Sequence, residues 1–288
     1  MKIAVIGTGG QLGTELQDIA AKRTDITWVF AGLEVVDLSK PETISAFVML
    51  EKPSVVINAG AYTSVDKAET DQALALQING HAVGTLAKAC SEVGATLIHI
   101  STDYVFNGNN TTPYLTTQAT DPVNYYGYSK MIGEQQALAA HATGTAIIRT
   151  SWVYSFYGNN FVKTMLRLMG ERESLNVVAD QQGCPTYAAD LAEACVAIAT
   201  ANNFVPGIFH YSNSGAITWH TFAATIGALA GKKCTVHPVP TSAYPTPAKR
   251  PAYSVMDLTA ITVAYPTVKV YAWEDSLKRC LQQLGALA

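Results

Sequence analysis

The sequence predicts an α/β protein: a Rossmann-like, doubly wound parallel sheet followed by a smaller C-terminal domain. Three observations predict it. Short apolar segments alternate with helix-like segments over the first 150 residues, as in parallel βαβ units. Those apolar segments are almost continuously hydrophobic, which is typical of a sheet covered on both faces. A glycine-rich turn also separates the first apolar segment from the first helix-like one.

The first half follows this alternation in order. Short runs rich in β-branched residues predict buried strands, and longer periodic segments predict helices. A loop rich in Pro, Asn, Gly and Thr covers about 107–124. The predicted strands are 2–7, 27–32, 54–60, 95–101 and 144–151, and the predicted helices are 14–23, 40–52, 68–93 and 125–140.

The second half is less regular. Helices are predicted over 159–172 and 190–201. The many prolines of residues 235–253 predict loop and edge structure. We therefore expect a dinucleotide-binding domain over 1–150 and a mainly substrate-binding domain over 151–288, with about 175–204 rejoining the first.

Composition excludes several classes of protein. The 288 residues are 49% hydrophobic and 14% charged, with a net charge of −3, so no basic excess favours nucleic acid or an anionic membrane surface. No apolar run approaches the roughly 18 residues of a membrane span, and the short apolar run at the N-terminus leads us to expect no signal peptide. Five cysteines without a CxxC pair predict free thiols in a reducing cytoplasm. No histidine pair has metal-ligand spacing, so we predict no metal site.

Gly7, Gly10 and Gly13 form a GxxGxxG turn between the first strand and helix. Such a turn lets the backbone approach a pyrophosphate, and the helix N-terminus offers free N–H groups to it. The expected acid or arginine at the end of the second strand is missing, because Ala31-Gly32-Leu33 stands there. Asp37, followed by Leu38, either caps the next helix or lies near the adenine. The choice between NADH and NADPH therefore stays open.

Tyr126 and Lys130 stand four residues apart on a predicted helix, so both share one face. An ammonium beside a phenol favours the phenolate and lowers its pKa, which makes Tyr126 a candidate general acid for a ketone oxygen. Tyr128 and Tyr125 lack this lysine spacing. Glu134 extends the face, either as a structural partner of Lys130 or as a solvated charge.

Two more segments directly follow the ends of predicted strands. Ser101-Thr102-Asp103 follows the fourth strand, at the sheet edge where ligands bind in such folds. A hydroxyl there would stabilise a developing oxyanion, although a turn that caps backbone groups is an equal alternative. Residues 58–63 are small enough to let a cofactor lie close, or simply to pack.

Taken together, these motifs resemble the dTDP-4-dehydrorhamnose reductase family of the extended short-chain dehydrogenase/reductases. The blocks that carry the resemblance span nearly the whole chain: GTGGQLG (7–13), NAGAYTSVDKAE (58–69), STDYVF (101–106), YGYSK (126–130), RTSWVY (149–154), GNNFVKTMLRL (158–168), DQQGCPTY (180–187) and RPAYSVMD (250–257). GxxGxxG and YxxxK mark only the superfamily, whereas the ordered set is far more specific.

The resemblance implies an NADPH- or NADH-dependent reduction of the C4 ketone of dTDP-4-dehydro-β-L-rhamnose. It assigns three catalytic residues: Tyr126 protonates the oxygen, Thr102 polarises the carbonyl, and Lys130 holds the nicotinamide ribose. The cofactor would also be lined by Gly10, Gln11, Leu12, Ala61, Tyr62 and Thr63, and the sugar nucleotide by Thr102, Asp103 and Trp152.

The resemblance has limits. Some relatives form a homodimer around a magnesium ion held by glutamates. Glu15 matches one of these, but Ala189 falls at another and Asp190 is one position off, so we predict no magnesium site. Lys249 or Arg250 would meet a pyrophosphate, or form a solvated basic pair. His99 is interpreted as a buried, hydrogen-bonded histidine, and Trp219 and Trp273 as core or interface residues.

Two alternatives share these motifs. The first is another nucleotide-sugar enzyme of the superfamily, either a 4-epimerase or a reductase of different stereochemistry. The second is a non-catalytic, NADP-binding regulatory subunit, as in the β-subunit of methionine adenosyltransferase. The intact Thr102, Tyr126 and Lys130 disfavour the second.

Overall fold

A computed structural model describes all residues, 1–288. At its centre lies a six-stranded sheet in which every pair of neighbouring strands is parallel. The strand order is β10-β5-β4-β3-β1-β2. The bounds are β1 Lys2–Ile6, β2 Thr27–Ala31, β3 Val55–Asn58, β4 Thr96–Thr102, β5 Thr145–Thr150 and β10 Gly207–His210. The predicted parallel α/β sheet is confirmed.

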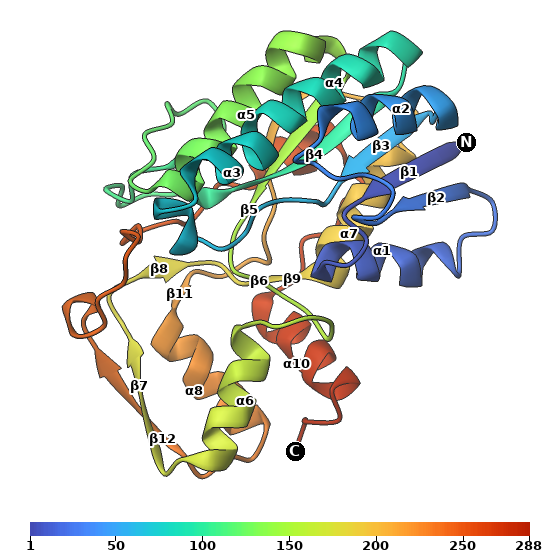
Figure 1. The fold of residues 1–288 in the computed structure, drawn as a ribbon. Coiled ribbons are helices and arrows are strands. Elements are labelled where there is room, and N and C mark those ends of the chain that lie inside the picture. Colours follow the sequence, from blue (N-terminus) through green and yellow to red (C-terminus); the bar gives the residue numbers. More distant parts are fainter.

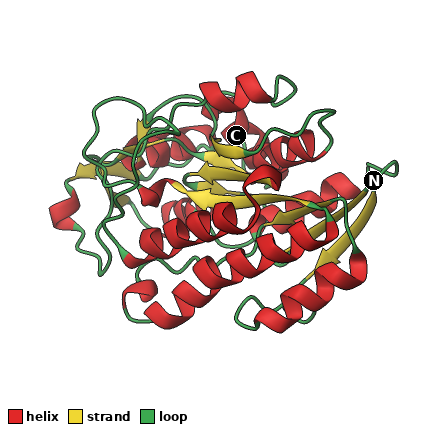
Figure 2. Ribbon diagram, turned by 90° about the horizontal axis from the view of Figure 1, so that it is seen from above, coloured by secondary structure: helices red, strands yellow, loops and turns green.

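Helices cover both faces of this sheet (Figures 1 and 2). One face packs against α1 (Gln11–Ala20), α7 (Ala188–Ala199) and the short α9 (Thr259–Ala264). The other packs against α2 (Pro41–Glu51), α4 (Ala82–Val93) and α5 (Tyr125–His141), with α3 (Gln72–Leu76) alongside. The sheet is therefore doubly wound.

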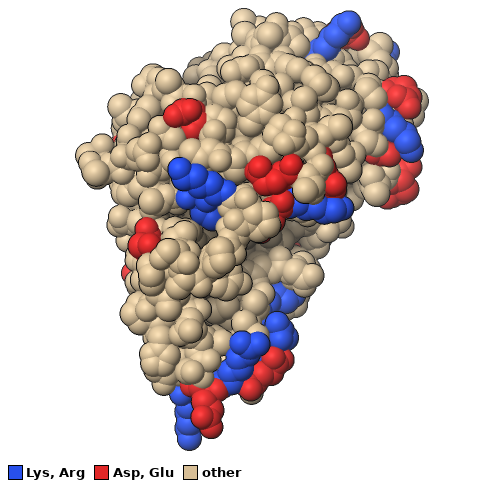
Figure 3. Space-filling model, turned by 60° about the vertical axis from the view of Figure 1, so that its left-hand side comes forward, with Lys and Arg blue, Asp and Glu red and all other residues tan.

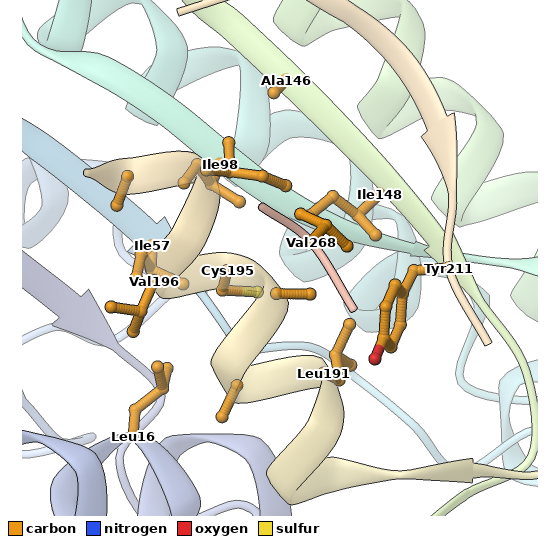
Figure 4. Close-up of a cluster of buried hydrophobic side chains, with 14 of the residues drawn as sticks. Leu16, Ile57, Ile98, Ala146, Ile148, Leu191, Cys195, Val196, Tyr211 and Val268 are labelled. Carbon is orange, nitrogen blue, oxygen red and sulfur yellow. The ribbon is translucent and has the colours of Figure 1, made fainter. Parts of the chain in front are cut away.

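Alternating side chains of the strands supply two separate cores, because successive residues of a strand point to opposite faces. Ile3 and Val5 pack toward α1 and α7, together with Ile57 and Ile98. Figure 4 shows Ile57 and Ile98 in one cluster with Leu16, Leu191 and Cys195. Ala4 and Ile6 instead join the core beneath α2 and α4. Burial on both sides explains the nearly continuous apolar strands.

The rest of the second half, apart from α7, α9 and β10, builds a separate lobe below the sheet in Figure 1. Its helices α6 (Phe161–Glu171), α8 (Trp219–Leu229) and α10 (Trp273–Gln283) enclose a third core that includes Tyr154, Phe222 and Trp273. Strands β7 (Ser174–Val178) and β12 (Thr235–Val239) form a parallel pair. Two shorter pairs join β6 (Val153–Tyr154) to β9 (Thr186–Tyr187) and β8 (Gln182–Gly183) to β11 (Ile217–Thr218).

The structure adds elements that the sequence pattern does not predict. Strand β10 has only four residues and follows a loop, so it carries no strong periodicity of its own; it forms by pairing with β5. Helices α8 and α10 are likewise additions. The helix predicted over 68–93 begins only at Gln72, after a 3₁₀ turn at Lys67–Glu69. It continues through a π-helical turn at Gln77–His81, and its end at Gly94 (φ +73°) is confirmed.

The surface agrees with the low charge of the sequence. On the face shown in Figure 3, uncharged atoms predominate and the charged side chains form small groups, most of them of mixed sign. All five cysteines are free, and four are buried. None of the helices combines the length and apolarity needed to cross a membrane.

Candidate active site

A cleft of about 810 Å³ opens at the carboxyl ends of the strands, between the sheet and the second lobe. Strand order reverses here, since β2 lies on one side of β1 and β3 on the other. Such a switch point is where open α/β sheets bind ligands. The segments that follow β1 to β5 all contribute to its lining.

The glycines of the turn after β1 play different structural roles. Gly7 has φ +88°, and a Cβ there would clash with the backbone nitrogen of Gly60. A Cβ on Gly13 would clash with the Gly7 carbonyl oxygen. Gly9 has nothing within 4 Å of that position, and Gly10 has only the Gly7 carbonyl at 3.6 Å. Gly7 and Gly13 are thus packed tightly against neighbouring backbone, whereas Gly9 and Gly10 leave open space beside the turn.

The open side of this turn fits the pyrophosphate of a nicotinamide dinucleotide. Gly10 caps α1 without a side-chain hydrogen bond, so the first N–H groups of the helix are free for an anion. Gln11 and Leu12 follow and line the cleft. The Gln11 Oε1 atom accepts a hydrogen bond of 3.1 Å from Asn160 of the second lobe.

Most of the residues expected at the cofactor do line the cleft: Gly7, Gly10, Gln11, Leu12, Asp37, Leu38, Ala61, Thr63, Tyr126 and Lys130. Gly13 and Tyr62 do not. Gly13 lets α1 pack against the turn, and the Tyr62 hydroxyl turns away to donate a hydrogen bond to Asp71. Of the two roles left open for Asp37, the structure does not support the cap: α2 has Lys40 as its N-cap residue and no side-chain cap, and the Asp37 carboxylate accepts hydrogen bonds from Ser39 instead. Asp37 does line the cleft.

Helix α5 brings Tyr126 and Lys130 to the cleft. Its N-cap residue, Asn124, accepts a hydrogen bond from the Gly127 nitrogen, and both side chains line the cavity. Lys130 is buried, and its Nζ atom donates to the Ile100 carbonyl at 2.6 Å and lies 3.4 Å from His99 Nε2. Tyr128 is 40% exposed and lies outside the cleft.

The pKa of the Tyr126 phenol differs from the expectation. Burial raises it to about 12, although a hydrogen bond with Thr102 opposes the rise. Burial also lowers the pKa of Lys130 to about 8. The lysine does not lower the tyrosine pKa here, because its ammonium is directed at the Ile100 carbonyl. Tyr126 therefore holds its proton at neutral pH, which is the state a proton donor needs.

Glu134 is neither a partner of Lys130 in a direct ion pair nor a solvated charge. It is buried, and both of its carboxylate oxygens accept hydrogen bonds from Arg149, at 2.9 and 2.6 Å. Ser101 donates a further hydrogen bond to it. The prediction for His99 is confirmed: it is fully buried, and its Nδ1 lies 3.1 Å from the Asn58 amide nitrogen.

Thr102 and Asp103 follow β4 into the cleft. The Thr102 hydroxyl donates to Asp103 Oδ1 at 3.1 Å and accepts from the Tyr104 nitrogen, so it both caps the turn and lies beside Tyr126. Burial raises the pKa of Asp103 to about 6. Its Oδ2 atom is buried without a hydrogen-bond partner. A ligand hydroxyl would satisfy that oxygen.

Trp152 and Trp219 form one wall of the cleft. Trp152 has φ +49°, an uncommon conformation for a bulky residue, and its indole stacks on Trp219 with ring centroids 3.6 Å apart. Trp219 packs against the core of the second lobe, as interpreted from the sequence, and it also lines the cleft. Nothing in its spacing signals this role, because α8 reaches the cleft only through the fold of the second lobe.

A second cavity, of about 650 Å³, continues from the cleft past Tyr104 and Trp219, which line both. Helix α6 supplies apolar side chains, including Phe161 and Met165, and Arg172 and Arg250 add positive charge. Sequence reasoning missed Tyr104, which lies in the STDYVF block with its ring 5.8 Å from that of Tyr126.

The structure places the two neighbouring basic residues, Lys249 and Arg250, in different environments. Arg250 donates to Asp66 at 2.8 Å, joining the second lobe to the sheet domain, whereas Lys249 is exposed and lines neither cavity. Two of the residues compared above with the magnesium ligands of relatives have protein partners. Glu15 accepts a hydrogen bond from Ser155, and Asp190 forms an ion pair with Arg279.

Comparisons with known proteins agree with this geometry. The family model described as RmlD substrate binding domain matches residues 1–286. A dTDP-4-dehydrorhamnose reductase of Burkholderia thailandensis is 42% identical over 99% of each chain. Among solved structures, the dTDP-4-dehydrorhamnose reductase of Clostridium acetobutylicum has a TM-score of 0.94 at 36% identity, covering 99% of this chain and 100% of the other. That of Bacillus anthracis, in complex with NADP, has a TM-score of 0.91 at 36% identity, covering 98% and 99%. The chain belongs to the dTDP-4-dehydrorhamnose reductase family.

Proposed function

We propose that this protein reduces the C4 ketone of dTDP-4-dehydro-β-L-rhamnose to the alcohol of dTDP-L-rhamnose. The observation that carries the proposal is the meeting of Thr102, Tyr126 and Lys130 in the same cleft as the open glycine turn. When bound there, the reduced nicotinamide supplies the hydride. The chain itself must hold the ketone, exclude water and deliver one proton.

Tyr126 is the proton donor in this proposal. Its phenol is protonated at neutral pH because burial raises its pKa to about 12, so it gives up the proton only as negative charge develops on the ketone oxygen. Thr102, whose hydroxyl lies beside Tyr126, turns its proton from Asp103 to the same oxygen and stabilises that charge. Lys130, buried in the same cleft, anchors the nicotinamide ribose.

The rest of the substrate would extend toward the second lobe. The unpartnered Asp103 Oδ2 accepts a hydrogen bond from a sugar hydroxyl. The stacked Trp152 and Trp219 offer an apolar surface to the sugar ring. The second cavity takes the nucleotide, because its lining combines apolar side chains for a base with Arg172 and Arg250 for a diphosphate.

The remaining proposals concern the whole protein. We propose that residues 1–150 with the returning segments hold the dinucleotide, and that 151–288 mainly hold the sugar nucleotide. We also propose that the protein forms a homodimer and is located in the cytoplasm. The five free cysteines support the cytoplasmic location, because free thiols suit a reducing compartment.

A coupled assay tests the reaction. The decrease in reduced nicotinamide absorbance is followed with NADH and with NADPH, while dTDP-4-dehydro-L-rhamnose is generated in place from dTDP-4-dehydro-6-deoxyglucose by its 3,5-epimerase. We expect oxidation that requires the epimerase and yields dTDP-L-rhamnose. Oxidation without the epimerase would change the sugar. Cofactor binding without any oxidation would favour the 4-epimerase or the regulatory subunit.

A further inference from the structure

His99 is an unusual residue for the middle of a buried strand. It lies in β4 between the apolar Ile98 and Ile100, and its side chain is fully buried. Ile98 packs in the core against α1 and α7, so the next side chain, His99, points to the opposite face, where α5 carries Lys130. A buried imidazole costs free energy unless its nitrogens are hydrogen-bonded. The two partners of His99 therefore indicate its role.

Asn58 decides which nitrogen of the His99 ring carries the proton. The two residues lie opposite each other in the paired strands β3 and β4. The Asn58 Oδ1 atom accepts a hydrogen bond of 3.2 Å from the Gly60 nitrogen, which can only donate. The amide orientation is thereby fixed, and its Nδ2 atom, also a donor, lies 3.1 Å from His99 Nδ1. Burial lowers the pKa of His99 well below its usual value, so the ring is neutral, Nδ1 accepts, and the proton is on Nε2.

The Nε2–H group of His99 is directed at Lys130. The lysine Nζ atom lies 3.4 Å from Nε2 and donates to the Ile100 carbonyl oxygen at 2.6 Å. An ammonium group has three N–H donors and no acceptor, whereas a neutral amine keeps a lone pair. Only the amine can accept the N–H of His99 while it still donates to Ile100. The hydrogen bonds then all run in one direction, from Gly60 to Ile100.

The charged and titratable groups around Lys130 do not reverse this preference. Glu134, on the same helix, favours the ammonium, but both of its carboxylate oxygens are bonded to Arg149 of β5. Tyr126 is a neutral phenol at this pH, and the carboxylate of Asp103, after β4, accepts a hydrogen bond from the neighbouring threonine. Burial has the largest influence and lowers the pKa of Lys130 to about 8. Lys130 therefore loses its proton more readily than an exposed lysine.

We propose that His99 is a positioning residue for the reaction: its Nε2–H, fixed by Asn58, favours the amine form of Lys130 and so lets this lysine release a proton to Tyr126. In the proposed function, Tyr126 gives its proton to the ketone oxygen while the hydride forms the new C–H bond, and a phenolate is left. The Lys130 ammonium returns a proton to that phenolate. The resulting amine accepts the N–H of His99 until it takes a proton from the solvent. The inference rests on the proposed function only for this transfer, because the proton on His99 is a property of the free protein.

Two NMR measurements on the purified full chain, without any ligand, test where these protons lie. Long-range proton–nitrogen correlation shows which ring nitrogen of His99 is protonated, with the signals assigned through bonds to the backbone. We expect the proton on Nε2, and a proton on Nδ1 would overturn the proposal. Titration of the lysine ε-carbon signals should give Lys130 a midpoint near pH 8. A midpoint near the ordinary value of about 10.4 would also overturn it.

A pair of variants attributes the effect to His99. His99→Phe keeps a ring but removes the N–H, so the amine of Lys130 loses its donor and the ammonium loses an unfavourable neighbour. The Lys130 midpoint should rise by about one pH unit. His210→Phe is the matched control, because His210 is equally buried but packs on Phe106 and does not line the cleft; it should leave the midpoint unchanged. An unshifted midpoint in His99→Phe would overturn the proposal.

The pH dependence of turnover distinguishes positioning from a merely structural role. If Lys130 supplies the proton, kcat of the wild type should fall above about pH 8, where the amine predominates. In His99→Phe this fall should move upward by the same shift as the NMR midpoint. A kcat reduced equally at every pH would mean that His99 acts only through stability, which contradicts the proposal. A protein with the expected proton positions that reduces no sugar would instead contradict the proposed function and sustain the hydrogen bond from His99 to Lys130.

Discussion

Tyr126 is the side chain on which the proposed proton transfer depends. Tyr126→Phe removes only the hydroxyl, so we expect kcat to fall about 100- to 10,000-fold while the Kd for the dinucleotide changes little. Steady-state kinetics together with fluorescence titration check both parts. Wild-type turnover in this variant would exclude Tyr126 as the acid. Tyr128→Phe, on the exposed side of the same helix, is the matched control and should behave as wild type.

Asp103 makes stability depend on pH with a definite sign. Burial raises its pKa from 3.8 to about 6, so the folded protein keeps a proton that the unfolded chain has released. Its contribution to the free energy of unfolding therefore falls as the pH rises from 3.8 through about 6. Urea unfolding at pH values below and above this window should show the fall in wild type.

The control for that prediction is Asp103→Asn, which does not titrate. Compared with this variant, wild type should lose stability across the window, and the difference should stay constant at higher pH. Parallel pH profiles for the two proteins would mean that Asp103 ionises normally in the folded state.

At the scale of the element, helix α1 depends on a glycine. A Cβ on Gly13 would clash with the Gly7 carbonyl oxygen and lie 2.7 Å from the Thr8 Cα. Because both neighbours are backbone, Gly13→Ala must shift the helix or the turn. We expect a loss of about 1–3 kcal/mol in the free energy of unfolding and weaker dinucleotide binding, measured by denaturation and titration.

Gly170→Ala is the contrasting variant. This glycine lies in α6, and no atom lies within 4 Å of the place that an alanine methyl group would take. Alanine should therefore stabilise the helix by about 0.5–1 kcal/mol. If both substitutions stabilised the protein, the close packing of α1 against the glycine turn would be refuted.

Helix α5 is held to the sheet by a buried ion pair. The side chains of Arg149 and Glu134 are only 2% and 4% exposed. Glu134→Gln leaves the guanidinium buried without its counter-charge, which should cost about 3–5 kcal/mol. Glu171→Gln breaks the exposed Arg167 pair on α6 and should cost less than about 1 kcal/mol. Chemical denaturation measures both, and similar losses would contradict the role of burial.

At the scale of the whole molecule, the cleft is complete only because two lobes meet. Trp219 comes from α8 of the second lobe and stacks on Trp152, which follows β5. Trp219→Ala should raise KM for the sugar nucleotide several-fold and leave the Kd for NADH unchanged, because Trp219 also lines the second cavity, to which the glycine turn does not contribute. Trp219→Phe, which keeps an aromatic surface, should restore most of the KM. An unchanged KM in the alanine variant would separate Trp219 from the substrate.

The sequence by itself determined the parallel sheet, its glycine turn and the pairing of Tyr126 with Lys130. These depend on local spacing: apolar runs between helices, glycines at strand ends, and two residues one helical turn apart. It also placed Thr102 and Asp103 correctly at the cleft, because carboxyl ends of parallel strands share one edge of the sheet. Of the residues expected at the cofactor, Gly13 and Tyr62 do not line the cleft, because helix packing holds the first and a hydrogen bond directs the second away.

Only the tertiary structure decided the rest. Strand β10 exists because β5 offers it a paired edge, Glu134 is buried because Arg149 lies opposite, and Trp219 reaches the cleft because α8 folds back beneath the sheet. Glu34 lies beside Gly32 through a turn that no periodicity announces. Each depends on a partner distant in the chain or on a local bend, and such contacts leave no repeating signal in the sequence.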